Sequence, residues 1–273
     1  MALMHLTKHH ALGNDFLVVV DVDNRHRVDA ELARRLCDRH RGVGADGLLR
    51  AGPGGDGADV SMEVRNADGS VAETTGNGIR CLAQAVLAAG VAHAHGPVLN
   101  VATAVGVCRL TVGPGTDPGE VMVEVDMGPA KLGPEQLGPM GEQARAVDVG
   151  NPHVVVLVPD PALAQVVADG SRLDAETPGG ANVEFVVVGP GRDELTMRVW
   201  ERGVGETLAC GSGACAAAAA AHDWGLVGPR VVVHQPGGDA RVAMEDGTVI
   251  LTGPSRHVAR IEVEVDGEVE VDG

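Results

Sequence analysis

The chain has 273 residues, of which 21 are basic and 38 acidic, giving a formal net charge of −17. That sign of charge argues against a basic face for phosphates, and so against a nucleic-acid partner. No stretch reaches the roughly 20 apolar residues of a membrane helix, the start lacks a signal-peptide core, and five cysteines do not make a disulfide framework. We therefore expect a cytoplasmic protein with free thiols and no membrane partner.

Short runs rich in valine recur along the chain and predict β-strands, because Gly, Pro, Asp or Asn bounds each of them. In chain order these strands span 16–21, 60–64, 105–112, 121–126, 154–158, 183–188, 195–200, 231–234 and 248–251. Helices are predicted over 29–40, 78–89, 161–168 and 213–222. The first has an Asp cap and apolar residues at three-to-four spacing. Many strands with a few helices indicate the α+β class.

One segment occurs twice, about half a chain length apart. Residues 74–86 and 209–221 each contain a hydroxyl or thiol residue, then Gly-x-Gly, then a run rich in alanine. Thr75 aligns with Cys210 in this repeat. Two halves that each present such a group at a glycine-opened helix start suggest one active site built between two related domains.

The glycine-rich segment 113–119 is the best linker candidate between these halves. It predicts an N-terminal domain over 1–115 and a C-terminal domain over 120–273, whose last strand could pack back on the first domain. The alternative is that 113–119 is only a hairpin loop between two strands. The position of the repeat, with one copy on either side, favours the domain junction.

A helix N-terminus carries unpaired N–H groups and about half a positive charge, so it binds anions such as carboxylates. Glycine lets a ligand approach the backbone closely, and a cysteine at such a position is expected to have a pKa below the free value of about 8.5. Two facing helices would grip one carboxylate and place Thr75 and Cys210 on opposite sides of it. That geometry suits removal and addition of a proton at one carbon.

Other interpretations of the repeat remain open. Residues 211–216 fit the loose dinucleotide pattern G-x-G-x-x-A, but the surroundings do not fit a βαβ unit. The two glycine-opened helices could also be purely structural. The remaining cysteines, Cys37, Cys81, Cys108 and Cys215, are interpreted as core residues.

No metal site is expected. The pairs Cys37–His40, His93–His95 and His9–His10 lack the four-ligand spacing of a zinc site, so surface or loop positions are favoured for these histidines.

Eight segments, in order, resemble the diaminopimelate epimerase family along nearly the whole chain. They are 12–16 (Leu-Gly-Asn-Asp-Phe), 37–46, 65–70, 76–78, 150–153, 182–185, 201–215 and 252–254. The long segment from Glu201 to Cys215 is the most specific of them. The resemblance implies a homodimeric isomerase that interconverts LL- and meso-diaminopimelate, a small amino acid of lysine and peptidoglycan biosynthesis, without pyridoxal phosphate or any other cofactor. It also implies two pseudo-symmetric α+β domains, each a β-barrel-like sheet around a central helix, with the active site in the interdomain cleft.

The resemblance also implies roles, position by position. Cys210 would be one catalytic thiol with Glu201 as its polarising partner, and His153 would be the partner of the other catalytic position, Thr75. The residues that would bind the substrate are Asn66, Asn151, Asn182 and Arg202 at the distal end, Asn14, Gly76, Asn77, Gly211 and Ser212 around the reacting end, and also Glu201. An arginine fork suits a carboxylate, and asparagines offer both donors and acceptors to a zwitterion.

This chain departs from the family pattern at two positions. The family usually has cysteine where this chain has Thr75, and glutamine where it has Gly47; a threonine hydroxyl is a much weaker acid than a thiol. Three interpretations follow. The chain is an epimerase in which Thr75, with His153 or a water, serves one face; or a one-base enzyme of the same fold that racemises another amino acid or catalyses an elimination; or a catalytically weak diaminopimelate-binding protein. The otherwise intact site favours the first.

Overall fold

The computed structural model describes residues 2–55, 57–72, 75–91, 97–139 and 141–265. The chain forms two compact units. Unit 1 is Met1–Val125 together with Pro254–Gly273, and unit 2 is Asp126–Gly253.

The predicted linker lies inside unit 1. Segment 113–119 is the hairpin between β6 (Gly106–Pro114) and β7 (Glu120–Asp126), which pair antiparallel from Leu110↔Val125 to Pro114↔Val121. The alternative interpretation of this segment is therefore the correct one. The division of the chain follows Val125 instead, and the residues from Pro254 onward belong to unit 1.

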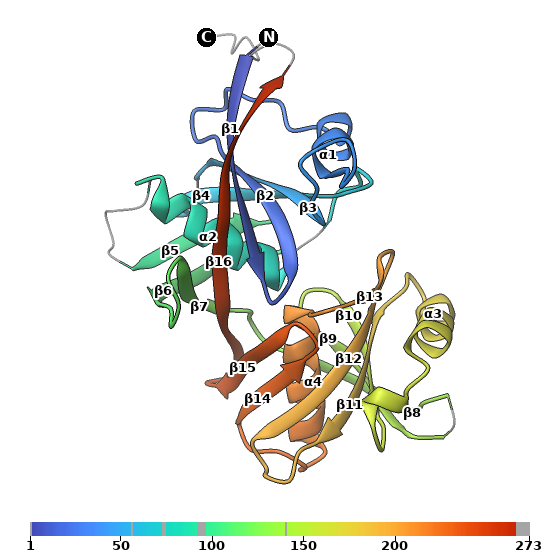
Figure 1. Ribbon diagram of the computed structural model, residues 1–273. Helices are drawn as coiled ribbons and strands as arrows, with labels where there is room; N and C mark the ends of the chain where they lie inside the picture. The colour runs from blue at the N-terminus through green and yellow to red at the C-terminus, as the bar shows by residue number, and fades with distance from the viewer. Residues whose placement is uncertain (1, 56, 73–74, 92–96, 140, 266–273) are drawn as a thin grey trace. The chain divides into compact units, whose positions relative to one another are not determined.

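Unit 1 is a sheet closed around a helix. Its strands are β1 (Ala2–Ala11), β2 (Asn14–Val20), β3 (Gly47–Pro53), β4 (Val60–Asn66), β5 (Val98–Thr103), β6, β7 and the second part of β16 (Thr248–Val265). They are neighbours in this order, and β1 also pairs with β16, so eight strands make a closed barrel. Figure 1 shows α2 (Gly76–Ala88) enclosed by these strands, and every residue from Gly76 to Val86 is buried.

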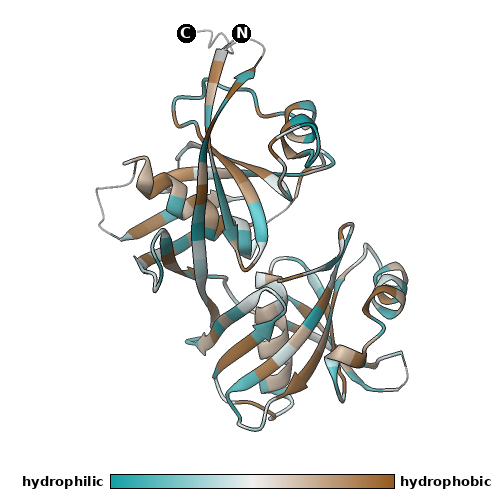
Figure 2. Cartoon of the chain, in the orientation of Figure 1, coloured by the Kyte–Doolittle hydropathy of each residue, from teal (hydrophilic) through white to brown (hydrophobic). Residues whose placement is uncertain are grey.

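Unit 2 repeats the order of strands and helices of unit 1. Its strands are β8 (Lys131–Leu137), β9 (Gln143–Asp148), β10 (Pro152–Leu157), β11 (Asn182–Val188), β12 (Glu194–Glu201), β13 (Gly205–Thr207), β14 (Arg230–Gln235), β15 (Gly238–Glu245) and the first part of β16. Helix α4 (Gly211–Asp223) packs against six of them, β9 to β12, β14 and β15. Figure 2 colours α4 pale to brown along its length, in keeping with the burial of every residue from Gly211 to Ala221.

The connections between strands are also repeated. An outer helix joins each first parallel pair: α1 (Ala30–Cys37) joins β2 to β3, and α3 (Val166–Glu176) joins β10 to β11. An inner helix joins each second parallel pair, α2 from β4 to β5 and α4 from β12 to β14. The predicted α+β class, with two similar units that each wrap a sheet around a helix, is confirmed.

The structure explains which predicted elements were correct. Asp29 caps α1 by accepting hydrogen bonds from the N–H groups of Glu31 and Leu32, as its position before the apolar pattern predicted. The prediction over 161–168 was wrong in its bounds. Pro161–Leu163 is a single 3₁₀ turn, Ala164 is extended, and α3 begins only at Val166 and runs to Glu176.

A leucine at position 218 should destabilise the protein. Ala218 is fully buried inside the sheet of unit 2, and the added side chain would force the surrounding strands apart. Overpacking of this kind costs about 1–3 kcal/mol. We expect Ala218→Leu to lower the urea midpoint, while Ala88→Leu, at the exposed end of α2, leaves it nearly unchanged. Equal midpoints for the two variants would show that α4 is not tightly enclosed.

Candidate active site

Thr75 and Cys210 occupy the same backbone position, the N-cap of the inner helix of their unit. Their φ/ψ angles are −133°/119° and −127°/119°. Thr75 Oγ1 accepts a hydrogen bond from the Gly78 N–H at 3.2 Å, and Cys210 Sγ accepts one from the Gly213 N–H at 3.3 Å. The sequence repeat therefore folds into the same cap twice.

The second glycine of each Gly-x-Gly is required by close approach. A Cβ on Gly78 would lie 2.3 Å from Thr75 Cγ2. A Cβ on Gly213 would lie 2.6 Å from Glu184 Oε1 and 3.2 Å from Cys210 Cβ. The absence of a side chain at Gly213 is thus what lets a carboxylate come up to the start of α4.

In unit 2 a continuous series of hydrogen bonds leads to the cysteine cap. His153 Nδ1 lies 2.7 Å from Glu184 Oε1, and its Nε2 lies 3.0 Å from Asn151 Oδ1. Asn151 Nδ2 donates to Ser212 Oγ at 3.4 Å, and Ser212 Oγ lies 3.5 Å from Cys210 Sγ. The side chains of His153 and Glu184 are fully buried, so the first contact of this series is shielded from water.

Glu201 is a second acidic residue near the cysteine. Its carboxylate accepts a hydrogen bond from the Thr207 hydroxyl, and the Cys210 thiol is near enough to act on the pKa of Glu201 in the lowering direction. Burial raises the pKa of Glu201 to about 6, and the neighbouring Glu184 carboxylate acts in the same direction.

The pKa expected for Cys210 from the sequence was wrong. Burial, and then the carboxylates of Glu201 and Glu184, raise the pKa of this thiol, and they outweigh the Ser212 hydroxyl and the Gly213 N–H that lower it. Cys210 at rest therefore carries its proton beside a carboxylate that can take it. A thiol near a carboxylate places an acid close to a base.

Two further predicted residues meet in unit 2. Asn182 Oδ1 accepts the backbone N–H of Arg202 at 2.9 Å, and Arg202 Nη1 donates to the Gly179 carbonyl at 2.9 Å. The backbone of Cys210 is held separately, because its N–H donates to Gln235 Oε1 at 2.8 Å.

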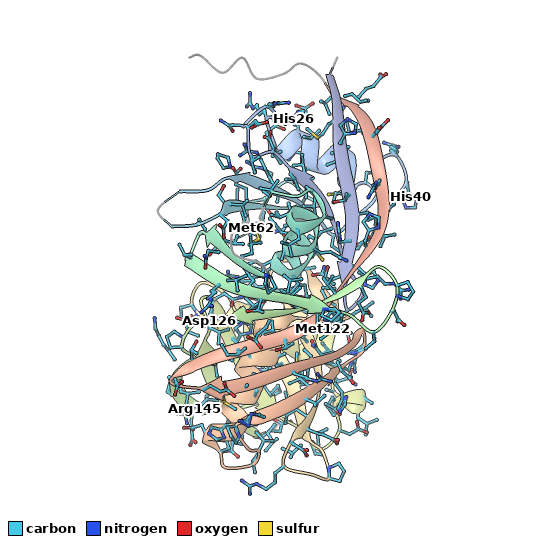
Figure 3. All side chains as sticks on the ribbon, turned by 90° about the vertical axis from the view of Figure 1, so that its left-hand side faces the viewer. His26, His40, Met62, Met122, Asp126 and Arg145 are labelled. Carbon is cyan, nitrogen blue, oxygen red and sulfur yellow. The ribbon has the colours of Figure 1, made fainter. Side chains whose placement is uncertain are left out.

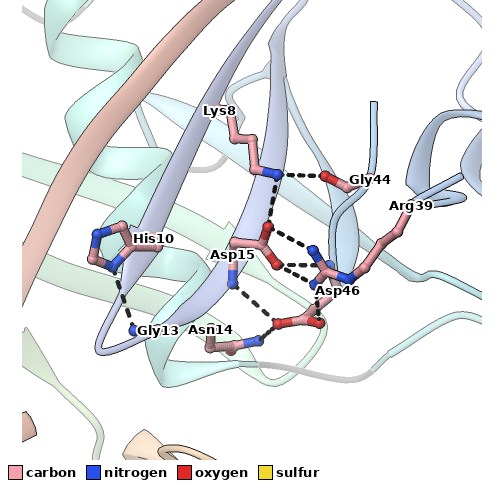
Figure 4. A network of polar contacts seen from close by, with 8 residues as sticks. All are labelled: Lys8, His10, Gly13, Asn14, Asp15, Arg39, Gly44 and Asp46. Carbon is pink, nitrogen blue, oxygen red and sulfur yellow. Dashed lines mark hydrogen bonds and ion pairs between the residues drawn. The ribbon is translucent and has the colours of Figure 1, made fainter. Parts of the chain in front are cut away.

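In unit 1, Asn14 follows a tight hairpin turn. Leu12 and Gly13, with φ of 54° and 86°, connect β1 to β2, the two positive φ values that a type I′ turn needs. Figure 4 shows how the side chain that follows is held: Asn14 Nδ2 donates to Asp46 Oδ2 at 2.8 Å, and Asp46 Oδ1 in turn accepts from Arg39 at 2.7 Å.

A second carboxylate completes this ionic network. Asp15 contacts Arg39 at 2.6 Å and Lys8 at 2.8 Å. Although burial acts to raise it, hydrogen bonds from Arg39 and Lys8 bring the pKa of Asp15 down to about 2. The network joins two of the quoted motifs, 12–16 and 37–46, and fixes Asn14 between them.

The other end of the Asn14 amide points to the start of α2. Asn14 Oδ1 accepts from Asn77 Nδ2 at 3.2 Å, and Asn77 Oδ1 accepts from Arg80 Nη2 at 2.8 Å. Arg80 Nη1 also donates to the Gly76 carbonyl at 2.9 Å. The donors thus run in one direction, from Arg80 through Asn77 and Asn14 to Asp46.

The remaining predicted positions of unit 1 are structural in these contacts. Asn66 closes a turn, since its Nδ2 donates to Ser70 Oγ at 3.0 Å and its N–H to the Ser70 carbonyl at 2.9 Å. A Cβ on Gly47 would lie 2.8 Å from the Arg65 carbonyl and 3.1 Å from the Phe16 ring. A glutamine at position 47 would therefore need the backbone or Phe16 to move.

Sequence reasoning missed four residues that hold the predicted ones: Arg39, Asp46, Glu184 and Gln235. Glu184 did give a signal, because it is a carboxylate within a strand that is otherwise apolar after its first residue. Arg39 and Asp46 stood inside a quoted motif without a role. Nothing local in the sequence marks Gln235, whose contact joins the end of β14 to the residue before α4.

The histidine and cysteine pairs do not converge. Cys37 is buried, whereas Figure 3 shows His40 on the outside of its unit. His93 and His95 lie outside the described residues. Across the described ranges, no group of three or more His, Cys, Asp or Glu side chains is arranged to hold a metal ion. In the same part of the chain, no helix is both long and apolar enough to cross a membrane.

Glutamine at position 201 should change how stability depends on pH. The folded pKa of Glu201 is about 6, above its ordinary value of 4.5, so folding favours the protonated form, and stability falls as pH rises through this window. The penalty is then fully present above about pH 6 and amounts to ~2 kcal/mol. We expect Glu201→Gln to gain about that much relative to the parent between about pH 4 and about pH 7.5, measured by urea unfolding.

The control is Glu264→Gln, on the exposed end of β16. It should show no such pH-dependent gain. A gain of equal size in both variants, or none in Glu201→Gln, would contradict the burial argument.

Comparison with known proteins identifies the family of this chain. The family model for diaminopimelate epimerase matches residues 6–133 and 145–258. A diaminopimelate epimerase of Pelotomaculum thermopropionicum is 39% identical over 93% of this chain and 97% of its own length. One of Moorella thermoacetica is 40% identical over 96% and 100%.

Solved structures share the fold at lower identity. A hydroxyproline epimerase from Agrobacterium vitis superposes with a TM-score of 0.74 at 18% identity, covering 97% of this chain and 93% of its own. A predicted epimerase from Pseudomonas aeruginosa gives 0.75 at 19%, covering 96% and 100%. The family match over most of the chain, together with the two capped helix starts, shows that this chain belongs to the diaminopimelate epimerase family.

Proposed function

We propose that this isomerase interconverts LL- and meso-diaminopimelate by moving the α-proton with its own side chains. The observation that carries the proposal is the buried Cys210 thiol that caps the N-terminus of α4, with the Glu201 carboxylate acting on its pKa, in a chain whose relatives of that name match it almost end to end. A thiol near a carboxylate can both give and take a proton at a carbon atom.

Cys210 serves one face of the α-carbon. In one direction its S–H bond breaks and the proton goes to the carbanion, leaving a thiolate. In the other, Glu201 first takes the thiol proton, and the thiolate then removes the α-proton to re-form the S–H bond. The pKa of Glu201, about 6, is near neutral pH, which makes it a suitable acceptor.

The start of each inner helix stabilises charge. We assign the substrate carboxylate next to the reacting carbon to the backbone N–H groups at Gly76 and Asn77 and at Gly211 and Ser212. Negative charge that develops as the proton leaves is favoured at a helix N-terminus. Asn14 completes the reacting end, held by Asp46 and Asn77.

Recognition of the distal, non-reacting end is assigned to Asn66, Asn151, Asn182 and Arg202. The Arg202 guanidinium can pair with a carboxylate, and the three asparagines provide donors and acceptors for its ammonium and carboxylate groups. We further propose a homodimer in the cytoplasm, an expectation that rests on family membership.

Thr75 is assigned to the other face, with a water that takes the α-proton when Cys210 is the donor and supplies the proton in the reverse direction. Both ring nitrogens of His153 already have partners, Glu184 and Asn151, which favours water over the imidazole in that role. One observation favours a second candidate, a one-base enzyme of the same fold. The hydrogen-bond series of unit 2 ends on Cys210, whereas the series of unit 1 runs from Arg80 to Asp46 without including Thr75.

The decisive experiment is proton NMR of the protein with LL-diaminopimelate in heavy water, followed by chiral analysis. We expect deuterium at the α-carbon and meso product, and we expect Cys210→Ala to abolish both. Exchange with retained configuration would support the one-base enzyme. Persistent exchange in Cys210→Ala would remove Cys210 from the mechanism.

A cysteine at position 75 should accelerate the reaction. A thiol at the α2 cap is a far stronger acid than a hydroxyl, so Thr75→Cys should raise the rate of meso product formation by at least about tenfold. Thr75→Ser is the matched control and should leave the rate within about threefold, because it keeps the hydroxyl. An unchanged rate in Thr75→Cys would mean that residue 75 does not transfer a proton.

A further inference from the structure

The hydrogen bonds around Cys210 have a definite direction. Glu184 and Asn151 both present oxygen atoms to the ring of His153. Each ring nitrogen of His153 therefore faces an oxygen that can accept a hydrogen bond. The ring lies between the Glu184 carboxylate and the Asn151 amide oxygen inside unit 2.

This pair fixes the amide of Asn151. With Oδ1 facing His153, the Nδ2 group faces Ser212 and donates to its Oγ. A serine hydroxyl that accepts on one side has its own hydrogen free for another acceptor. The neighbour 3.5 Å away is Cys210 Sγ, so the hydroxyl hydrogen is directed at the sulfur.

Unit 1 provides a comparison, because apolar residues occupy the positions of His153 and Glu184. Phe16 is paired with Gly47 in unit 1 as His153 is paired with Asn182 in unit 2, so Phe16 corresponds to His153. Leu49 corresponds to Glu184. Leu49 lies 3.4 Å from where a Cβ on Gly78 would be, and Glu184 lies 2.6 Å from where a Cβ on Gly213 would be. With the apolar residues Phe16 and Leu49 at these positions, Asn14 is oriented by Asp46 instead. The side-chain oxygen of Asn14, rather than its nitrogen, faces the start of α2.

We propose that the His153–Glu184 pair, acting through Asn151, aims the Ser212 hydroxyl at Cys210 Sγ, so that Ser212 and Asn151 are positioning residues for the thiolate. When Glu201 takes the thiol proton, the sulfur already has two donors, the Ser212 hydroxyl and the Gly213 N–H. The catalytic consequence rests on the proposed function, but the effect on the thiol itself does not.

The charged groups near Cys210 are few. Glu184 on β11, His153 on β10 and Glu201 on β12 face it or its partners. On β9, Arg145 pairs with Asp223 at the far end of α4, and on β14 and β15 His234 pairs with Asp239 at the surface.

The test is the rate of Cys210 alkylation by iodoacetamide at one fixed pH, followed by site-resolved mass spectrometry in a Cys108→Ser background. Cys108 is only half-buried and would otherwise consume reagent. Ser212→Ala should lower the rate about tenfold, because a hydrogen bond to a charged group is lost and the thiolate fraction falls. Better access past the smaller alanine would change the rate in the opposite direction. Ser212→Thr, which keeps the hydroxyl, should stay within about threefold of the parent.

Asn151→Asp tests the direction of the series without changing its shape. Aspartate can only accept, so the Ser212 hydrogen would turn to residue 151 and away from the sulfur. In that background Ser212→Ala should change the alkylation rate by less than about twofold, although it costs about tenfold in the parent. The cycle cancels the direct effect of the added negative charge, which is present in both aspartate variants.

Two results would overturn the proposal: an alkylation rate that Ser212→Ala leaves unchanged or raises, or an equal fold-change in both backgrounds. Deuterium exchange measured in parallel should show kcat falling more than KM in Ser212→Ala. Because alkylation needs no substrate, the expected alkylation pattern without any exchange would count against the proposed function alone. Exchange without that pattern would count against this proposal alone.

Discussion

A helix enclosed in a sheet must satisfy its first N–H groups without bulk water, and much of the site depends on that constraint. Unpaired N–H groups at a buried helix start are costly. Each unit satisfies one of them with the side chain of the residue before the helix, Thr75 or Cys210. The side-chain atom that caps the helix is therefore also the atom that can give or take a proton at the helix N-terminus. Structural and chemical roles fall on the same position.

The second consequence is electrostatic. A helix N-terminus favours a thiolate, but burial and two carboxylates oppose it at Cys210, and they prevail. The result is a thiol that keeps its proton until a neighbour accepts it. Such a resting state is less open to oxidation and to metal ions than an exposed thiolate, since the thiolate is the reactive form. The group that can activate the thiol is Glu201, whose own pKa is raised toward neutral pH.

Sequence patterns predicted the helices and strands that have strong local signals. They failed where contacts between residues far apart in the sequence determine the structure. The Asp29 cap, the valine-rich strands and the repeated Gly-x-Gly were sufficient for most strands, three of the four helices and the doubled plan. Segment 113–119 misled, because glycine and proline mark a hairpin loop and a domain linker equally well. Strand β8, with most of its residues exposed, has no alternation to recognise.

The site divides in the same way. The residues with family motifs could be named from the sequence, whereas their supports, such as Glu184 and Gln235, depend on contacts between separate strands and helices. A pKa depends on the same distant contacts, which is why the expected acidity of Cys210 was wrong. Chemistry carried by residue type was predictable, and chemistry carried by surroundings was not.

The alanine run of α4 has one more consequence. Alanine side chains are short and alike, so the surface of this part of α4 is nearly uniform. Packing of the strands against it does little to prevent the helix from sliding or turning. Contacts at its two ends help to set its rotation. At one end Cys210 is tied to Gln235 and Ser212, and at the other Asp223 is tied to Arg145. The reacting sulfur therefore lies at one of the two ends where side-chain contacts hold the helix. The contacts that fix the rotation of α4 also fix the direction of the Cys210 side chain.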